Sequence, residues 1–247
     1  MLFSKKVQGQ PKKPEIYHYL RSEGEKKKRI HLRIDTDGYA TLLVNANRMY
    51  HFNPSAAYMA KAFLDGKTNM EVVKGLMHAF QVNKKQAAVD YLTFKEQLEM
   101  IASPNSDACP FCDLNVEVEG PFSKQPSAPY RMDLALTYAC DNDCAHCYNV
   151  KQRSFSHTLS FEEWKQVLQK VWDTGIPHVV FTGGEPTLVK YLPDLIRYAE
   201  GLGLITGLNT NGRALKDAAF VQELVEAGLD HIQVTLASHD PEIHDQM

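Results

Sequence analysis

The segment Cys140-Asp141-Asn142-Asp143-Cys144-Ala145-His146-Cys147-Tyr148 places three cysteines within eight residues, directly after a strand-like run at residues 133–139. Three thiolates in one loop can hold three irons of a 4Fe–4S cluster and leave the fourth iron open for a cosubstrate. A zinc site with His146 as the fourth ligand, or three unligated thiols, would also fit the residue types. Zinc ligands usually come as two separated pairs, so the single tight loop favours a cluster.

From residue 131 onward the sequence alternates between strand-like and helical segments. The strand-like runs lie at residues 133–139, 178–182, 204–209 and 231–236, and the helical segments at 160–173, 192–200 and 217–227. Repeated βα units predict a parallel α/β sheet, either doubly wound or a partial (β/α) barrel of about four units. Functional residues of a barrel collect at the carboxyl ends of its strands, and the unusual residues of this chain fall there.

The tetrapeptide Gly183-Gly184-Glu185-Pro186 follows the second of these strands, at the same end of the sheet as the cysteine loop. Two glycines let the backbone approach a ligand closely, and a carboxylate can hold an ammonium group. Such a turn is common after strands, so the tetrapeptide alone does not indicate a binding site. Its position one βα unit after the cysteines does.

Together these segments resemble the radical S-adenosylmethionine superfamily. The Cys-x3-Cys-x2-Cys loop and the Gly-Gly-Glu-Pro segment match two of its motifs. Asn209-Thr210-Asn211-Gly212 is similar to its third-strand turn, and residues 233–238 and 240–245 are similar to its fourth-strand segment. The likeness covers residues 131–247 and implies a partial barrel that cleaves S-adenosylmethionine reductively to methionine and a 5′-deoxyadenosyl radical.

The resemblance also assigns site residues, with no catalytic residue among them. A 4Fe–4S cluster is expected on Cys140, Cys144 and Cys147. S-adenosylmethionine is expected on eight residues: Gly183, Gly184 and Glu185 at the methionyl amine, Asn209, Asn211 and Ser238 at the ribose or carboxylate, and His146 and Tyr148 beside the cluster and the adenine. An electron donor such as ferredoxin or flavodoxin is expected as a partner.

Residues 29–102 are predicted to form a separate α+β module. Short strand-like runs at 30–34, 39–44 and 49–52 precede helical segments at 54–64, 68–80 and 83–101. A small sheet followed by three helices predicts a winged-helix-like module. Residues 50–57, 63–67 and 68–73 resemble the peptide-recognition domains of maturases of ribosomally made peptides. That resemblance implies a peptide or protein substrate, including a leader peptide added as a strand to the sheet edge.

The remaining segments set the domain boundaries. Residues 1–28 are rich in Lys and Pro and are expected to form a flexible arm, and residues 103–130 a linker. Cys109 and Cys112 in that linker stay unassigned between a second metal site, a redox pair and incidental thiols. Residues 131–247 supply four strands where the family has six, so we expect an N-terminal fragment of a longer protein or half of a split one.

Composition narrows the partners. The net charge of −3 gives no overall attraction to nucleic acid, and no run of eighteen apolar residues is present to span a membrane. The lack of a secretory signal predicts the reducing cytoplasm, where thiolates remain ligands. The sequence therefore predicts a radical enzyme acting on a peptide or protein. A radical enzyme of cofactor biosynthesis is the alternative, and an iron–sulfur scaffold or a winged-helix nucleic-acid reader is a distant one.

Overall fold

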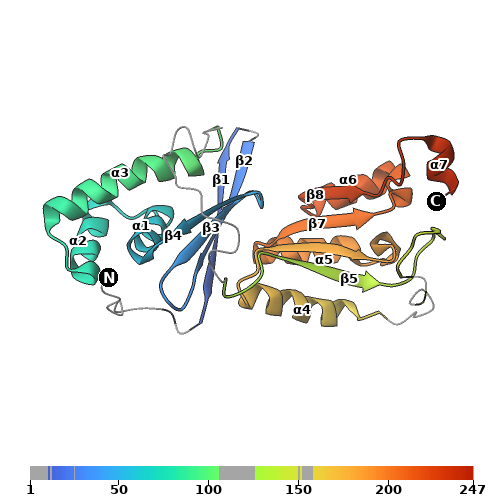
Figure 1. Ribbon diagram of the computed structural model, residues 1–247, viewed down its shortest axis with the longest axis horizontal. Helices are drawn as coiled ribbons and strands as arrows, with labels where there is room; N and C mark the ends of the chain where they lie inside the picture. The colour runs from blue at the N-terminus through green and yellow to red at the C-terminus, as the bar shows by residue number, and fades with distance from the viewer. Residues whose placement is uncertain are drawn as a thin grey trace. The chain divides into compact units, whose positions relative to one another are not determined.

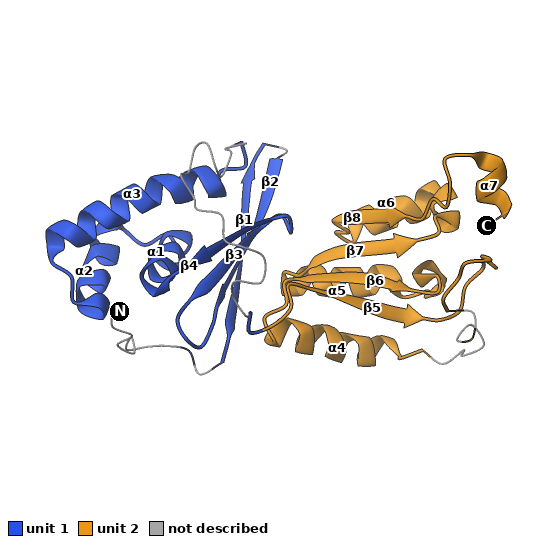
Figure 2. Cartoon of the chain, in the orientation of Figure 1, with its two compact units in different colours: residues 1–127 blue, residues 128–247 orange. Residues whose placement is uncertain are grey.

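The computed structural model describes residues 11, 13–24, 26–105, 126–149, 151 and 158–246. The chain divides into two compact units, Met1–Ser127 and Ala128–Met247, each with its own sheet and its own hydrophobic core (Figure 2). The boundary falls within the predicted linker 103–130, of which residues 106–125 lie outside the described residues.

Unit 1 begins with an antiparallel sheet of four strands (Figure 1). The strands are β1 (Glu15–Glu23), β2 (Lys26–Ile34), β3 (Ala40–Val44) and β4 (Arg48–Phe52), and they pair in that order. The sequence predicted three of them. The flexible arm expected over residues 1–28 is wrong for β1, which pairs with β2 along its whole length.

Besides its pairing with β2, β1 is held by contacts with residues far from it in sequence. The Tyr19 hydroxyl donates to Asp65 Oδ1 at 2.7 Å, and the Arg21 guanidinium donates to the Leu64 carbonyl at 3.2 Å. Tyr17 and Tyr19 also pack against the core of unit 1. Tyr19 and Arg21 therefore fasten the first strand to the end of the first helix.

Three helices follow the sheet, as the sequence predicted: α1 (Pro54–Leu64), α2 (Asn69–Phe80) and α3 (Lys84–Ala102). Each starts at a side-chain cap. Asn53 accepts from the Ala56 amide and Asn83 from the Gln86 amide, both at 2.9 Å, and the capping box predicted at residues 68 and 71 is present. These caps satisfy amide donors that the first turn of a helix leaves unpaired, so they fix where each helix begins.

Unit 2 is a parallel sheet with the strand order β5-β6-β7-β8 (Figure 1). The strands are β5 (Arg131–Thr137), β6 (His178–Gly183), β7 (Ile205–Thr210) and β8 (His231–Val234). The helices α4 (Phe161–Asp173), α5 (Leu192–Leu202) and α6 (Ala218–Glu226) alternate with them, and short helices η2 (Pro186–Leu188), η3 (Arg213–Lys216) and α7 (Pro241–Gln246) follow β6, β7 and β8.

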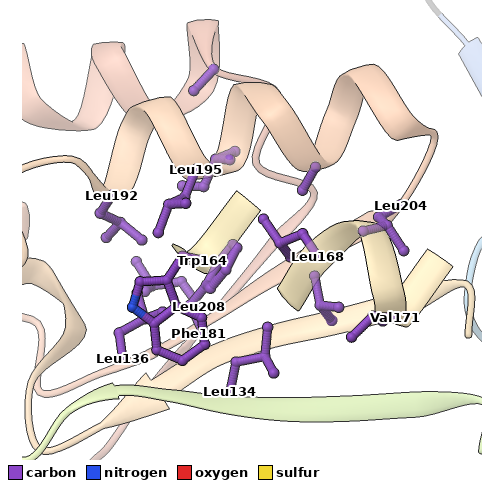
Figure 3. Packing of buried hydrophobic residues seen from close by; sticks show 14 of the residues in the cluster. Leu134, Leu136, Trp164, Leu168, Val171, Phe181, Leu192, Leu195, Leu204 and Leu208 are labelled. Atoms are coloured by element: carbon purple, nitrogen blue, oxygen red, sulfur yellow. The ribbon is translucent and has the colours of Figure 1, made fainter. Parts of the chain in front are cut away.

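One face of this sheet packs against the helices. Leu134, Leu136, Phe181 and Leu208 from the strands lie among residues of α4 and α5 such as Leu168 (Figure 3). Since neighbouring residues of a strand point to opposite faces, Thr182 and Asn209 lie on the other face. Helices gathered on one face are compatible with part of a (β/α) barrel, whereas a doubly wound sheet carries helices on both faces.

No helix within the described ranges is both long and apolar enough to cross a membrane.

Candidate functional site

A pocket of about 550 Å³ lies at the carboxyl ends of the strands of unit 2. The pocket is lined by the cysteine loop after β5, the double glycine at the end of β6, the end of β7 and the segment after β8. Nine of the eleven predicted site residues are in its wall: Cys140, Cys144, Cys147, His146, Tyr148, Gly183, Gly184, Asn209 and Asn211. The other two, Glu185 and Ser238, are not.

The three cysteines of the loop carry half-buried thiols. The Asn142 amide donates to Cys140 Sγ at 3.4 Å, and the Cys147 amide donates to the Cys144 carbonyl at 3.2 Å, so the loop turns tightly. Among the described residues, no three His, Cys, Asp or Glu side chains converge on a point where one ion could sit. A cubane needs no such convergence because each thiolate binds a different iron, so the loop fits a cluster.

The two glycines meet protein backbone as well as the pocket. The Gly184 amide donates to the Thr137 carbonyl at 2.7 Å, and the Glu185 amide donates to the Ala139 carbonyl at 2.8 Å. A Cβ on either glycine would overlap the backbone of residues 137–139, and Gly183 also has a φ of +133°. The glycines therefore let the end of β6 run directly against the segment that leads into Cys140, a reason that the motif alone did not give.

The carboxylate of Glu185 is bound within the chain. Its side chain is buried, with 1% of the residue exposed, and its carboxylate accepts four hydrogen bonds. Oε1 accepts from the Thr187 amide at 3.1 Å and from the Thr187 and Thr210 hydroxyls at 2.7 Å. Oε2 accepts from the Asn211 amide at 2.8 Å. These four donors come from this chain, so in this structure the carboxylate joins the ends of β6 and β7.

Asn211 joins the end of β7 to the cysteine loop. Its Nδ2 donates to Asp141 Oδ1 at 2.7 Å, and its Oδ1 accepts from the Arg213 amide at 2.9 Å. Ser238, outside the pocket wall, accepts from the Asp240 amide at 3.1 Å and so closes the turn before α7. Tyr148 is 86% exposed.

The pocket also contains residues that the motifs did not identify. Asp141, Asn149, Arg213 and His244 all line it. Asn149 is buried, and its Nδ2 donates to the Gly183 carbonyl at 3.4 Å. In the sequence, only its position two residues after Cys147 could have indicated that Asn149 belongs to the site. Cys109 and Cys112 lie outside the described residues.

Residues 134–247 match the family model described as the Radical SAM superfamily. PqqA peptide cyclase of Rhizobium meliloti (strain 1021) is 37% identical over 120 residues, which are 48% of this chain and 32% of that protein. Fe-coproporphyrin III synthase of Methanosarcina barkeri (strain Fusaro / DSM 804) is 38% identical over 102 residues, 41% of this chain and 25% of that protein. The matched segments span a third or less of these relatives.

Solved structures of Streptococcus suis SuiB share the fold. SuiB bound to S-adenosylmethionine aligns with a TM-score of 0.55 at 18% identity, over 92% of this chain and 50% of that chain. SuiB bound to the precursor peptide SuiA aligns with a TM-score of 0.53 at 16% identity, over 84% of this chain and 47% of that chain. Since neither unit makes up 84% of the chain, both alignments include parts of both units.

Proposed function

Because residues 134–247 are a domain of the radical SAM superfamily, we propose that this chain is the cluster-binding part of an enzyme that cleaves S-adenosylmethionine reductively and modifies a peptide. The observation that carries the proposal is the pocket itself, which gathers three cysteines of one loop and the double glycine of the next strand. This is where a parallel α/β fold places its chemistry.

The residues of the pocket have distinct tasks in this proposal. Cys140, Cys144 and Cys147 bind three irons of a 4Fe–4S cluster. When bound, the cluster supplies the electron that breaks a carbon–sulfur bond of S-adenosylmethionine. Asn209 and backbone groups at Gly183 and Gly184 orient the cosubstrate. His146 and Tyr148 would lie beside the cluster and the adenine. Ferredoxin or flavodoxin in a reducing cytoplasm is the proposed source of electrons.

Unit 1 is proposed to be a winged-helix-like domain that binds a leader peptide. The names of two similar proteins support a peptide substrate, PqqA peptide cyclase and SuiB bound to precursor peptide SuiA. The sheet of unit 1 has two edge strands, β1 and β4. At β4, Phe52 contacts Phe94 of α3 edge-to-face at 5.3 Å, so an added strand on this edge would lie near a helix.

A radical enzyme of cofactor biosynthesis is the second candidate, favoured by the similarity to Fe-coproporphyrin III synthase. The two candidates differ in substrate. Incubation with synthetic copies of short peptides encoded in neighbouring reading frames, followed by mass spectrometry, separates them. A cosubstrate-dependent mass change in a peptide supports the first candidate, and a set of unchanged peptides favours the second.

The radical chemistry is tested by anaerobic reconstitution with iron and sulfide, reduction with dithionite and assay for 5′-deoxyadenosine. We expect about four irons per chain and formation of 5′-deoxyadenosine. Cys144→Ala should abolish both, while Ala145→Ser, one residue away and exposed, should retain both. Uptake of zinc in place of an iron–sulfur cluster would overturn the proposal.

A further inference from the structure

A chain of hydrogen bonds leads from the buried carboxylate of Glu185 to the cysteine loop. Glu185 Oε2 accepts from the backbone amide of Asn211, and the side chain of the same residue donates to Asp141 Oδ1 at 2.7 Å. Asn211 thus donates to two carboxylates, to Glu185 through its backbone N–H and to Asp141 through its side-chain Nδ2. Two segments that lie 70 residues apart in sequence are joined through this single side chain.

Asp141 lies where such a connection affects a ligand thiolate. Asp141 is the residue between Cys140 and Asn142. The backbone amide of Asn142 donates to Cys140 Sγ at 3.4 Å. An amide hydrogen bond to a ligating sulfur stabilises the thiolate and influences the potential of a cluster bound to it. The geometry of that bond depends on the turn at residues 140–142, and Asn211 holds the middle residue of the turn.

The carboxylate of Glu185 is suited to anchor Asn211. A buried carboxylate is costly unless hydrogen bonds replace its lost water, and Glu185 obtains four from the chain. Two of those donors belong to Thr187, which follows β6, and one belongs to Thr210, which ends β7. The carboxylate is therefore held from both strands. An anchor of this kind leaves little freedom for the backbone at residue 211.

From this network we infer that Asn211 and Asp141 are positioning residues that set the Cys140 thiolate for cluster binding, with Glu185 as their buried anchor. This assigns Glu185 to holding the site together, where the motif suggested contact with the methionyl ammonium. It also assigns the amide group of Asn211 to the cysteine loop. The inference rests on the proposed cluster, but it concerns contacts within the chain itself.

Iron release from the reconstituted protein tests the inference. In Asn211→Ala and Asp141→Ala, iron should pass to a chelator such as bathophenanthroline about tenfold faster than in the wild type. Asp141→Asn keeps the Oδ1 acceptor, so its release rate should stay within about twofold of the wild type. The spectrum of the reduced cluster in electron paramagnetic resonance should shift in the two alanine variants and stay unshifted in Asp141→Asn.

The double variant Asp141→Ala/Asn211→Ala distinguishes a shared contact from two separate effects. If the hydrogen bond carries the effect, the double variant should release iron no faster than either single variant. The melting temperature of metal-free Asp141→Ala should differ from that of the metal-free wild type by less than about 3 °C, because Asp141 is exposed.

Three results would overturn the inference: equal release from the wild type and both alanine variants, an Asp141→Asn variant as fast as Asp141→Ala, or additive effects in the double variant. A wild-type protein that takes up no iron–sulfur cluster would instead overturn the proposed function.

Discussion

The side chains of His178 and His231 contact each other across β7, the strand that lies between their own two strands. His178 begins β6 and His231 begins β8, and their Nε2 atoms lie 2.9 Å apart over the intervening β7. The rings are edge-to-face, with centroids 5.0 Å apart. Gly207 of β7 leaves the space for this contact, because a Cβ there would overlap the His231 ring. The pair lies at the amino end of the sheet, opposite the pocket.

The histidine pair predicts a loss of stability in mild acid. Burial, and then the nearby charges of His231 and Arg131, lower the pKa of His178 from 6.5 to about 4. The unfolded chain therefore takes up a proton at a higher pH than the folded chain, so this contribution is complete above pH 6.5 and is lost as the pH falls toward 4. Urea unfolding at pH 7.5 and pH 5 should show a decrease of about 1 kcal/mol, since solvent screens part of the interaction.

His178→Gln serves as the control for that pH dependence. The variant lacks the group that titrates, so its stability should change less between the two pH values than that of the wild type. An equal decrease in both proteins would contradict the assignment to His178.

Gly207→Ala should destabilise unit 2 by about 1–2 kcal/mol, because the added methyl group displaces the His231 ring from its contact with His178. Gly201→Ala is the matched control. Gly201 lies in α5 with open space around the position of a Cβ, so alanine there should be neutral or slightly stabilising. Urea unfolding of the two variants gives the comparison, and similar values for both would refute the packing argument.

Gly184→Ala should disturb the cysteine loop through the backbone. The new Cβ would overlap carbonyl oxygens of residues 138 and 139, and backbone atoms cannot move aside as a flexible side chain can. We expect a loss of about 2–4 kcal/mol together with fewer irons per chain after reconstitution. Gly201→Ala again provides the control. Full iron content in Gly184→Ala would show that the contact with residues 138–139 is not needed.

Glu185→Gln tests the buried carboxylate. Glutamine keeps the shape of the side chain but turns one acceptor oxygen into a donor that faces donors of the chain. The stability should fall by about 1–3 kcal/mol in urea unfolding. Glu162→Gln, at an exposed position of α4, should change it by less than about 0.5 kcal/mol. Equal stabilities of the two variants would mean that the carboxylate is not needed as an acceptor.

Tyr19 predicts alkaline sensitivity of unit 1. Burial, and then the hydrogen bond to Asp65, raise the pKa of Tyr19 well above its usual value of 10. The unfolded chain loses this proton first, so stability should fall as the pH rises above 10. Tyr19→Phe lacks the hydroxyl that titrates. Its stability should be lower by about 1 kcal/mol at pH 7, and it should lose less between pH 9 and 11 than the wild type, measured by urea unfolding.

The sequence predicted much of the framework because the relevant signals are local. Capping residues such as Thr68 and Ser160 bond to amides three residues on, so they mark helix starts within a short window. The four strands of unit 2 and the residues of the cysteine loop were found in the same way. Strand β1 was missed because residues 1–28 were interpreted from their Lys and Pro content, although β1 forms a local hairpin with β2.

What the sequence determined by itself is which candidate ligand residues follow which strands, because spacing within a loop and alternation of βα units are properties of short stretches of chain. Only the tertiary structure decided what several of those residues do. Glu185 accepts four hydrogen bonds within the chain, and the two glycines contact backbone, because their partners are brought close by parallel pairing of β5, β6 and β7. Hydrogen bonds between strands depend on how the chain folds back, and no local pattern records which donor will arrive at a given carboxylate.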